Sequence, residues 1–128
     1  MAGEFIADNV FDNGLSYLTT NGETIYITNA AATTLAEAQT TFSLGQKTGV
    51  TVGAAANATG NGRSVTVSAI TDGTVDGTGT ASHWALTKDS ATAELLATGP
   101  LASTQGVTSG NTFTLTAIEI IIRDATVT

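Results

Sequence analysis

The chain contains no cysteine, one proline and only four lysine and arginine residues among its 128 residues. The absence of cysteine excludes a disulfide framework and a metal site built from thiolates. Eleven aspartate and glutamate residues outnumber the cations and give a formal net charge of −7. The cations are too few and too scattered to form the basic stripe that binds phosphate backbones. We therefore expect no direct contact with nucleic acid; the four cations are Lys47, Arg63, Lys88 and Arg123.

Long apolar runs are also missing. The longest nearly apolar run, from Ile118 to Ile122, contains Glu119 and is far shorter than a membrane span. The first six residues lack the basic region and apolar run of a signal peptide. We therefore expect a protein that is made in a cytoplasm and does not enter a membrane.

Threonine and glycine are abundant, and both point to β-structure. Threonine favours strands, and the 14 glycines suit the turns between them. A chain of 128 residues is long enough for one domain with its own core. The sequence predicts a mainly β fold: one antiparallel β-sandwich or jelly-roll-like domain over residues 1–128, with one or two short helices near the N-terminus. Residues 1–22 would form a helix or arm, and residues 23–128 the β-sandwich.

The first half of the chain mixes helical and extended patterns. Phe11, Leu15 and Leu18 have helical spacing, and Asp8 or Asn9 is suited to cap the helix start. Residues 23–28 predict a strand with Ile25 and Ile27 inward.

A second helical signal follows this strand. Thr34 and Glu37 fit a capping box that opens one or two helical turns through Gln39. Residues 42–61 are rich in glycine, alanine and threonine, and we interpret them as a long ordered loop with a short extended piece at residues 50–52.

The centre of the chain carries the strongest strand signal. Residues 63–70 alternate strictly, with Val65, Val67 and Ala69 on one face. Residues 71–79 hold three glycines and two aspartates, which favour tight turns. Residues 80–86 alternate again and place Trp84, the only tryptophan, on the inner face. Trp84 is the largest apolar side chain available, so we predict that it anchors the core.

The last third predicts a hairpin and a final strand. Residues 92–98 form a strand that pairs with the Trp84 strand, and Gly99 and Pro100 end it. Residues 101–104 extend again before a loop at residues 105–110. The final strand covers residues 111–117, with Phe113, Leu115 and Ala117 inward.

The apolar pattern changes phase at residue 118. Ile118, Ile120 and Ile122 would lie on the face that threonines occupy earlier in the same strand. Either a bulge turns them inward, or the strand stays regular and they face a partner. An uncovered run of this kind favours aggregation. We therefore expect the protein itself or a neighbouring subunit to cover them, and we take all three as candidate interface residues.

No pattern predicts catalysis or a cofactor. His83 is the only histidine, and Ser82 would point to the opposite face of the strand. Asp72 and Asp76 lack the spacing of a calcium loop, so turn formation is the simpler interpretation, although ion binding by this loop stays open. Residues 45–49 and 77–79 hold only fragments of phosphate-binding and dinucleotide-binding motifs. We expect no enzymatic activity.

The order of segments resembles a family of small accessory virion proteins of tailed bacteriophages, which are often encoded near the major capsid protein. The most specific part is GRSVTVSAITDG at 62–73 followed by GTGTASHW at 77–84. The other resembling segments are IYIT at 25–28, TTLAEA at 33–38, FSLGQKTG at 42–49 and VTSGNTFTL at 107–115.

The resemblance implies a structural virion protein and supplies no catalytic residues. It implies a capsid decoration (cement) protein on the capsid surface, synthesised in the host bacterial cytoplasm, whose partner is the major capsid protein. By analogy with decoration proteins it also implies a homo-oligomer, with a trimer preferred. The alternative is a tail or head-fibre component that binds a host-surface receptor.

Overall fold

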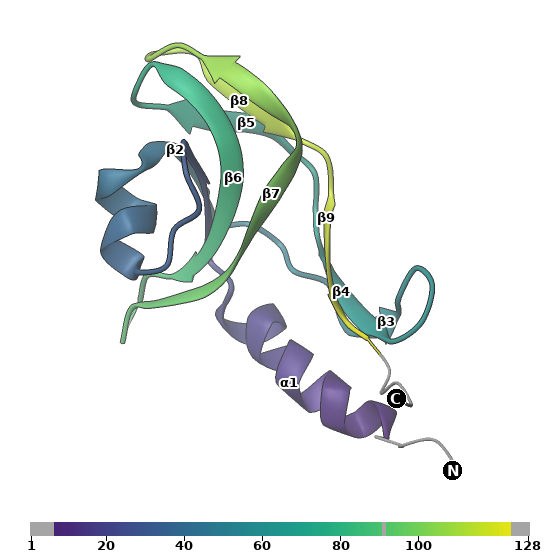
Figure 1. The fold of residues 1–128 in the computed structure, drawn as a ribbon. Coiled ribbons are helices and arrows are strands. Elements are labelled where there is room, and N and C mark those ends of the chain that lie inside the picture. The colour runs from purple at the N-terminus through teal and green to yellow at the C-terminus, as the bar shows by residue number, and fades with distance from the viewer. Residues whose placement is uncertain (1–6, 91, 124–128) are drawn as a thin grey trace.

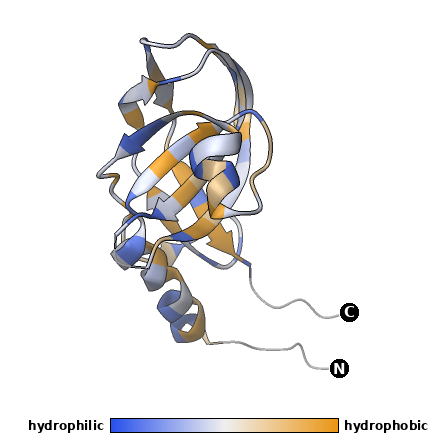
Figure 2. Ribbon diagram, turned by 90° about the vertical axis from the view of Figure 1, so that its left-hand side faces the viewer, coloured by the Kyte–Doolittle hydropathy of each residue, from blue (hydrophilic) through white to orange (hydrophobic). Residues whose placement is uncertain are grey.

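The computed structural model describes residues 7–90 and 92–123. It contains a six-stranded sheet, a three-stranded sheet and one α-helix near the N-terminus (Figure 1). The predicted fold class, mainly antiparallel β with short helical elements near the N-terminus, is confirmed. Hydrophobic and hydrophilic residues alternate along the curled strands in Figure 2, as expected for strands with one buried face.

The larger sheet has the strand order β7-β6-β1-β2-β5-β8, and every neighbouring pair is antiparallel. The sheet curls into a half-barrel, so that its edge strands β7 and β8 face each other across an opening (Figure 1). Its strands are β1 Thr24–Thr28, β2 Ser43–Thr48, β5 Ile70–Val75, β6 Gly79–Lys88, β7 Glu94–Val107 and β8 Thr112–Leu115.

The smaller sheet has the order β3-β4-β9 and lies next to the helix α1. Its strands are β3 Ala56–Asn57, β4 Arg63–Val67 and β9 Ile118–Ile122, and the helix is α1 Asp8–Asn21. Phe11 and Leu15 are the buried residues of α1, and the helix packs mainly on β4.

One main hydrophobic cluster joins α1 and both sheets. Burying a large apolar side chain stabilises the fold by about 1.5–3 kcal/mol, so this shared cluster ties the elements together. Its buried members are Leu15, Ile25, Ile27, Leu44, Val52, Val65, Val67, Ile70, Val75, Ala81, Trp84, Leu86, Val107, Phe113 and Leu115.

The second helical element is a single π-helical turn, η1 Glu37–Thr41. The Thr34 hydroxyl oxygen accepts a hydrogen bond from the Glu37 backbone N–H at 3.1 Å, as the predicted capping box requires. The Glu37 carboxylate instead accepts the backbone N–H and hydroxyl of Thr33, at 2.8 and 2.9 Å. Ala38 packs with Ala32 and Ala85 in a second, smaller cluster.

The helix at the N-terminus is confirmed, but its predicted cap is wrong. Ala7 is the N-cap residue and makes no side-chain capping hydrogen bond, while Asp8 and Asn9 lie inside the helix. Asp8 occupies the first turn, where a carboxylate interacts favourably with the helix dipole. The helix ends at Asn21, and the strand expected at residues 23–28 forms as β1, which begins at Thr24.

The predicted long loop at residues 42–61 is wrong, because residues 43–48 form the inner strand β2. This segment lacks the alternation of β-branched residues that marks a strand. Its glycine has a packing role: a Cβ at Gly45 would lie 2.2 Å from the carbonyl oxygen of Thr74 on β5. The predicted extended piece nearby corresponds to a bridge between Val52 and Val67.

The predicted strand at residues 63–70 is two strands in two sheets. β4 ends at Val67, and after Ser68 and Ala69 the chain enters the larger sheet as β5. Ala69 is therefore exposed, not inward. β5 covers residues 70–75 and so includes much of the predicted turn region. Gly73 has a packing role within this strand, since a Cβ there would lie 2.2 Å from the Phe113 ring.

The predicted strand end at Gly99 and Pro100 is also wrong. The hairpin between β6 and β7 forms as expected, but β7 continues through both residues to Val107. An edge strand tolerates proline, because the missing amide can face away from the neighbouring strand. The pairing is irregular opposite Pro100, between Ala81 and His83.

The phase change at residue 118 has a simple structural cause. β8 ends at Leu115, and β9 begins at Ile118 in the other sheet, so Ala117 is an exposed linker residue and not inward. The change is therefore neither a bulge nor a regular continuation of one strand.

Candidate functional site

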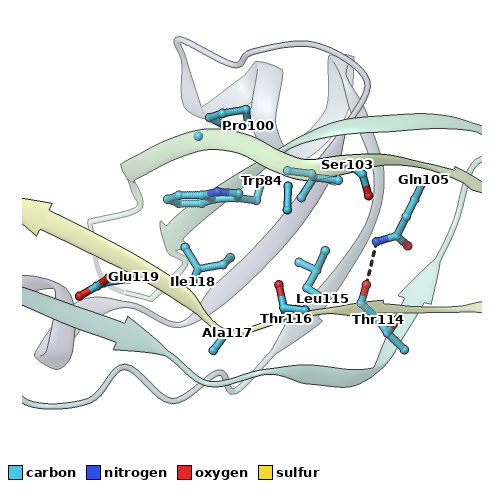
Figure 3. A pocket seen from close by; sticks show the side chains of 13 residues that line it. Trp84, Pro100, Ser103, Gln105, Thr114, Leu115, Thr116, Ala117, Ile118 and Glu119 are labelled. Atoms are coloured by element: carbon cyan, nitrogen blue, oxygen red, sulfur yellow. Dashed lines mark hydrogen bonds between the residues drawn. The ribbon is translucent and has the colours of Figure 1, made fainter. Parts of the chain in front are cut away.

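A slot of about 500 Å³ opens between β7 on one side and β8 with the start of β9 on the other (Figure 3). It lies where the half-barrel fails to close on itself. The slot is lined by Trp84, Gly99, Pro100, Leu101, Ala102, Ser103, Gln105, Thr114, Leu115, Thr116, Ala117, Ile118 and Glu119.

The two walls of the slot are unpaired strand edges. In the part of the chain that the structure describes, no backbone hydrogen bond joins β7 to β8. The side chain of Gln105 crosses the slot instead, and its amide Nε2 donates to the carbonyl oxygen of Thr114 at 2.8 Å (Figure 3). Backbone groups along both walls are thus available to an outside partner.

The floor of the slot is apolar. The indole of Trp84 and the side chains of Leu115 and Ile118 point into it (Figure 3). Trp84 is 8% exposed and belongs to the main hydrophobic cluster. The predicted core anchor therefore lies in the core and also forms part of the slot wall.

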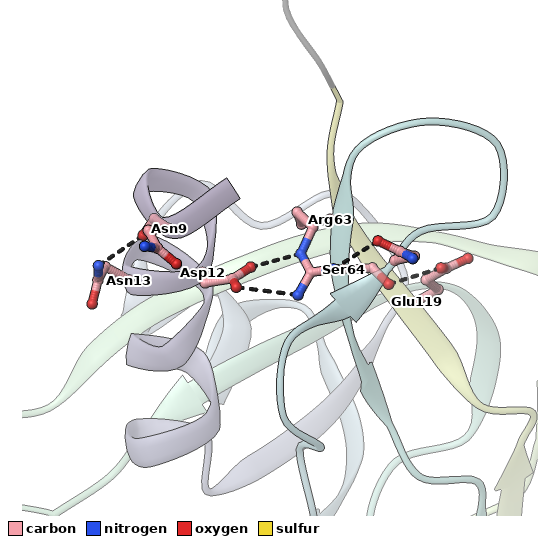
Figure 4. Close-up of polar contacts among 7 residues, drawn as sticks. Asn9, Asp12, Asn13, Arg63, Ser64 and Glu119 are labelled. Carbon is pink, nitrogen blue, oxygen red and sulfur yellow. Dashed lines mark hydrogen bonds and ion pairs between the residues drawn. The ribbon is translucent and has the colours of Figure 1, made fainter. Parts of the chain in front are cut away.

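The slot is almost free of charge, although the chain is acidic. No charged residue occurs between Leu95 and Val107 or between Thr112 and Ile118. Glu119 is the exception. Its carboxylate accepts the hydroxyl of Ser64 at 2.9 Å (Figure 4) and the backbone N–H of Thr59 at 3.0 Å. The Thr59 N–H first, and then the Ser64 hydroxyl, lower the pKa of Glu119 below its usual value.

The three predicted interface isoleucines lie together on β9. Ile118 is paired with Val67 and Ile120 with Val65. These isoleucines therefore lie on the same face of the smaller sheet as the two buried valines. All three pack against the main cluster and remain partly exposed. Their contribution to an interface stays a prediction, and only Ile118 reaches the slot.

The helix is attached to the smaller sheet by a two-pronged ion pair. Arg63 Nε donates to Asp12 Oδ1 at 2.8 Å, and its Nη2 donates to Asp12 Oδ2 at 3.1 Å (Figure 4). The third prong, Arg63 Nη1, donates to the side chain of Asn57 at 2.7 Å. Asp12 raises the pKa of the Arg63 guanidinium, and the planar geometry fixes the helix orientation.

His83 and Ser82 are closer than the sequence predicted. Ser82 Oγ lies 2.8 Å from His83 Nδ1, at hydrogen-bond distance. The register beside them is irregular, because only Ser82 separates Ala81 and His83 on β6 while residues 101–104 separate their partners on β7.

The structure does not bring Asp72 and Asp76 together as ion ligands. Asp72 lies within β5 and forms a salt bridge with Lys47 at 3.0 Å, so it is not a turn residue. Asp76 follows the strand, and its carbonyl oxygen accepts the Ser109 hydroxyl at 3.0 Å. The described residues include no group of three or more histidines, aspartates or glutamates placed to hold a metal ion.

Sequence reasoning missed the slot and its polar residues Gln105 and Thr114. The available signal was the uncharged run at residues 95–107, but its pairing with a distant segment is not visible in the sequence.

No described helix has the length and hydropathy needed to cross a bilayer. Comparison of the chain with protein-family models, with curated protein sequences and with solved structures found no match.

Proposed function

We propose that this protein is a structural virion protein of a tailed bacteriophage that decorates the capsid by binding the major capsid protein. The family resemblance described above motivates the proposal. The structural observation that supports it best is the long edge of β7, which is uncharged from Leu95 to Val107 and lies beside an open slot. Free strand edges of this kind bind other polypeptides through their backbone groups.

A decoration protein stabilises a head by many modest contacts repeated over a lattice. Each copy that bridges neighbouring capsid subunits gains avidity from the fixed spacing of its sites. In this proposal the protein sits on the capsid surface as a homo-oligomer, for which a trimer matches the three-fold positions of a capsid by analogy.

The location of the protein in intact particles tests this proposal. Cryo-electron microscopy of the virion should show density of this fold on the outer surface of the head. Immunogold labelling should mark heads in the same preparation. Labelling confined to tails would contradict the capsid role and support the receptor-binding alternative, and unlabelled virions would exclude both.

A further inference from the structure

We infer that the slot binds one extended, uncharged segment of a partner protein, which enters as an additional strand between β7 and β8. This goes beyond capsid decoration by naming the surface and the form of the bound segment. The assignment of that segment to the major capsid protein rests on the proposed function.

The strand directions permit such an insertion. Neighbouring strands alternate in direction throughout the sheet, so β7 and β8 run antiparallel to each other. A strand between them would be antiparallel to one wall and parallel to the other, and both arrangements form regular hydrogen-bond ladders. The slot follows residues 99–105 on β7 and residues 114–119 opposite, which suits a segment of about five residues at about 3.3 Å per residue.

The hydrogen bond across the slot uses a side-chain donor. The carbonyl oxygen of Thr114 receives the side-chain amide of Gln105, not a backbone amide from β7. A side chain can swing away without disturbing either strand. An incoming backbone N–H can therefore replace the Gln105 amide at this oxygen.

Charge and polarity define the segment that fits. The chain has a net charge of −7, yet both walls are uncharged from 95 to 107 and from 112 to 118. A neutral segment therefore enters without removing water from an unpaired charge. Alternate side chains of the bound segment would cover the apolar floor formed by Trp84, Leu115 and Ile118, and its remaining side chains would point outward.

A second copy of this chain fits the slot less well. The edge strand β7 of another copy could pair with β7, and this would extend the sheet outward. Such pairing would leave the apolar floor of the slot uncovered.

A library of random heptapeptides displayed on yeast provides a probe that does not depend on the capsid. The intact protein should enrich uncharged sequences with apolar residues at alternate positions. Thr116→Lys, at an exposed residue of the slot, should weaken binding of the enriched peptides by about tenfold or more. Thr74→Lys makes the same change at an exposed position of β5 outside the slot and should leave binding unchanged.

Two further readouts keep the inference falsifiable. Gln105→Ala should bind the peptides as well as or better than the parent, because it frees the Thr114 carbonyl oxygen. Bound peptide should slow amide hydrogen exchange at residues 101–105 and 114–119, which form the two walls. The inference is overturned if no peptide is enriched, if Thr116→Lys binds normally, if Gln105→Ala loses binding, or if exchange slows elsewhere and not along the slot.

Binding to phage heads that were assembled without this protein tests the slot and the capsid role separately. Co-sedimentation of the parent but not of Thr116→Lys would support both. If the parent binds peptides and not heads, the capsid role fails and the slot stands. If parent and Thr116→Lys bind heads equally well, the capsid contact lies elsewhere and the assignment of the slot to the capsid protein is wrong.

Discussion

Gly99 on β7 lies directly against the indole ring of Trp84 on β6. The two residues are paired across the strands, and a Cβ at Gly99 would lie 2.8 Å from Trp84 Cζ2. The absence of a side chain at Gly99 therefore lets the tryptophan lie flat beneath the edge strand. Through this contact, the position of the β7 wall of the slot depends on the packing of Trp84 in the core.

Trp84→Ala should destabilise the protein by about 3–5 kcal/mol, the usual range for removing a large buried aromatic side chain. The reason is its burial at 8% exposure within the main cluster. Urea denaturation of the parent and variant measures the loss. Val10→Ala, at a side chain that is 62% exposed, is the control and should change little. A Trp84→Ala protein that unfolds like the parent would show that Trp84 does not anchor the core.

Gly99→Ala should destabilise by about 1–3 kcal/mol, because the added methyl group overlaps the indole ring. Gly106→Ala on the same strand is the matched control, since a Cβ there meets no atom within 4 Å. In the Trp84→Ala background, the cost of Gly99→Ala should largely disappear. Thermal unfolding of the four proteins in this double-mutant cycle tests the contact. Equal costs in both backgrounds would show that the ring is not what excludes a side chain.

Ile120→Asp should destabilise the protein much more than Ile121→Asp. Ile120 packs against the main cluster on the face of Val65, whereas Ile121 is paired with Ser64 on the other face of the sheet. Circular dichroism melting and analytical ultracentrifugation of both variants distinguish core from interface. A folded Ile120→Asp protein that no longer self-associates would instead show that this residue faces a partner.

The Arg63–Asp12 ion pair should hold α1 on the smaller sheet. Asp12→Asn and Arg63→Met should each speed amide exchange in α1, and the double variant should add little beyond either single change. Exchange in the β1–β6 ladder, which does not contact this pair, is the internal control. Additive effects of the two substitutions would indicate that the contact does not couple helix and sheet.

Glu23 should contribute to stability in a pH-dependent way. The Ser90 hydroxyl, followed by the backbone N–H groups of Asp89 and Ser90, lowers the pKa of Glu23 below its ordinary value of 4.5. A carboxyl group with a lowered pKa in the folded protein stabilises it above the unfolded pKa, and this contribution is lost as pH falls through the folded pKa.

The test for Glu23 is the melting temperature of Glu23→Gln as a function of pH. The variant should melt below the parent at neutral pH, and the difference should shrink as the pH falls below about 4.5. Asp76→Asn, at an exposed residue whose described hydrogen bonds use only its backbone, is the control. A difference that stays constant from neutral pH to below the folded pKa would rule out the carboxylate as its source.

The sequence by itself determined the fold class and the buried faces of several strands and of the helix. Strict alternation placed Ile25 and Ile27 inward, and helical spacing identified α1 through Phe11 and Leu15. The phase change at residue 118 coincides with the break between β8 and β9, although neither the bulge nor the regular strand expected there occurs. These features depend on how often apolar residues repeat over short stretches of the chain.

Only the tertiary structure decided where strands end and which edges remain free. Gly45 and Gly73 resemble loop residues, yet they lie in strands because a distant backbone or ring occupies the space of their missing Cβ atoms. Pro100 resembles a strand end, yet β7 continues through it because it is at the sheet edge. The slot exists because the curl of six strands brings β7 and β8 face to face. This meeting depends on non-local pairing, which no local pattern of residues encodes.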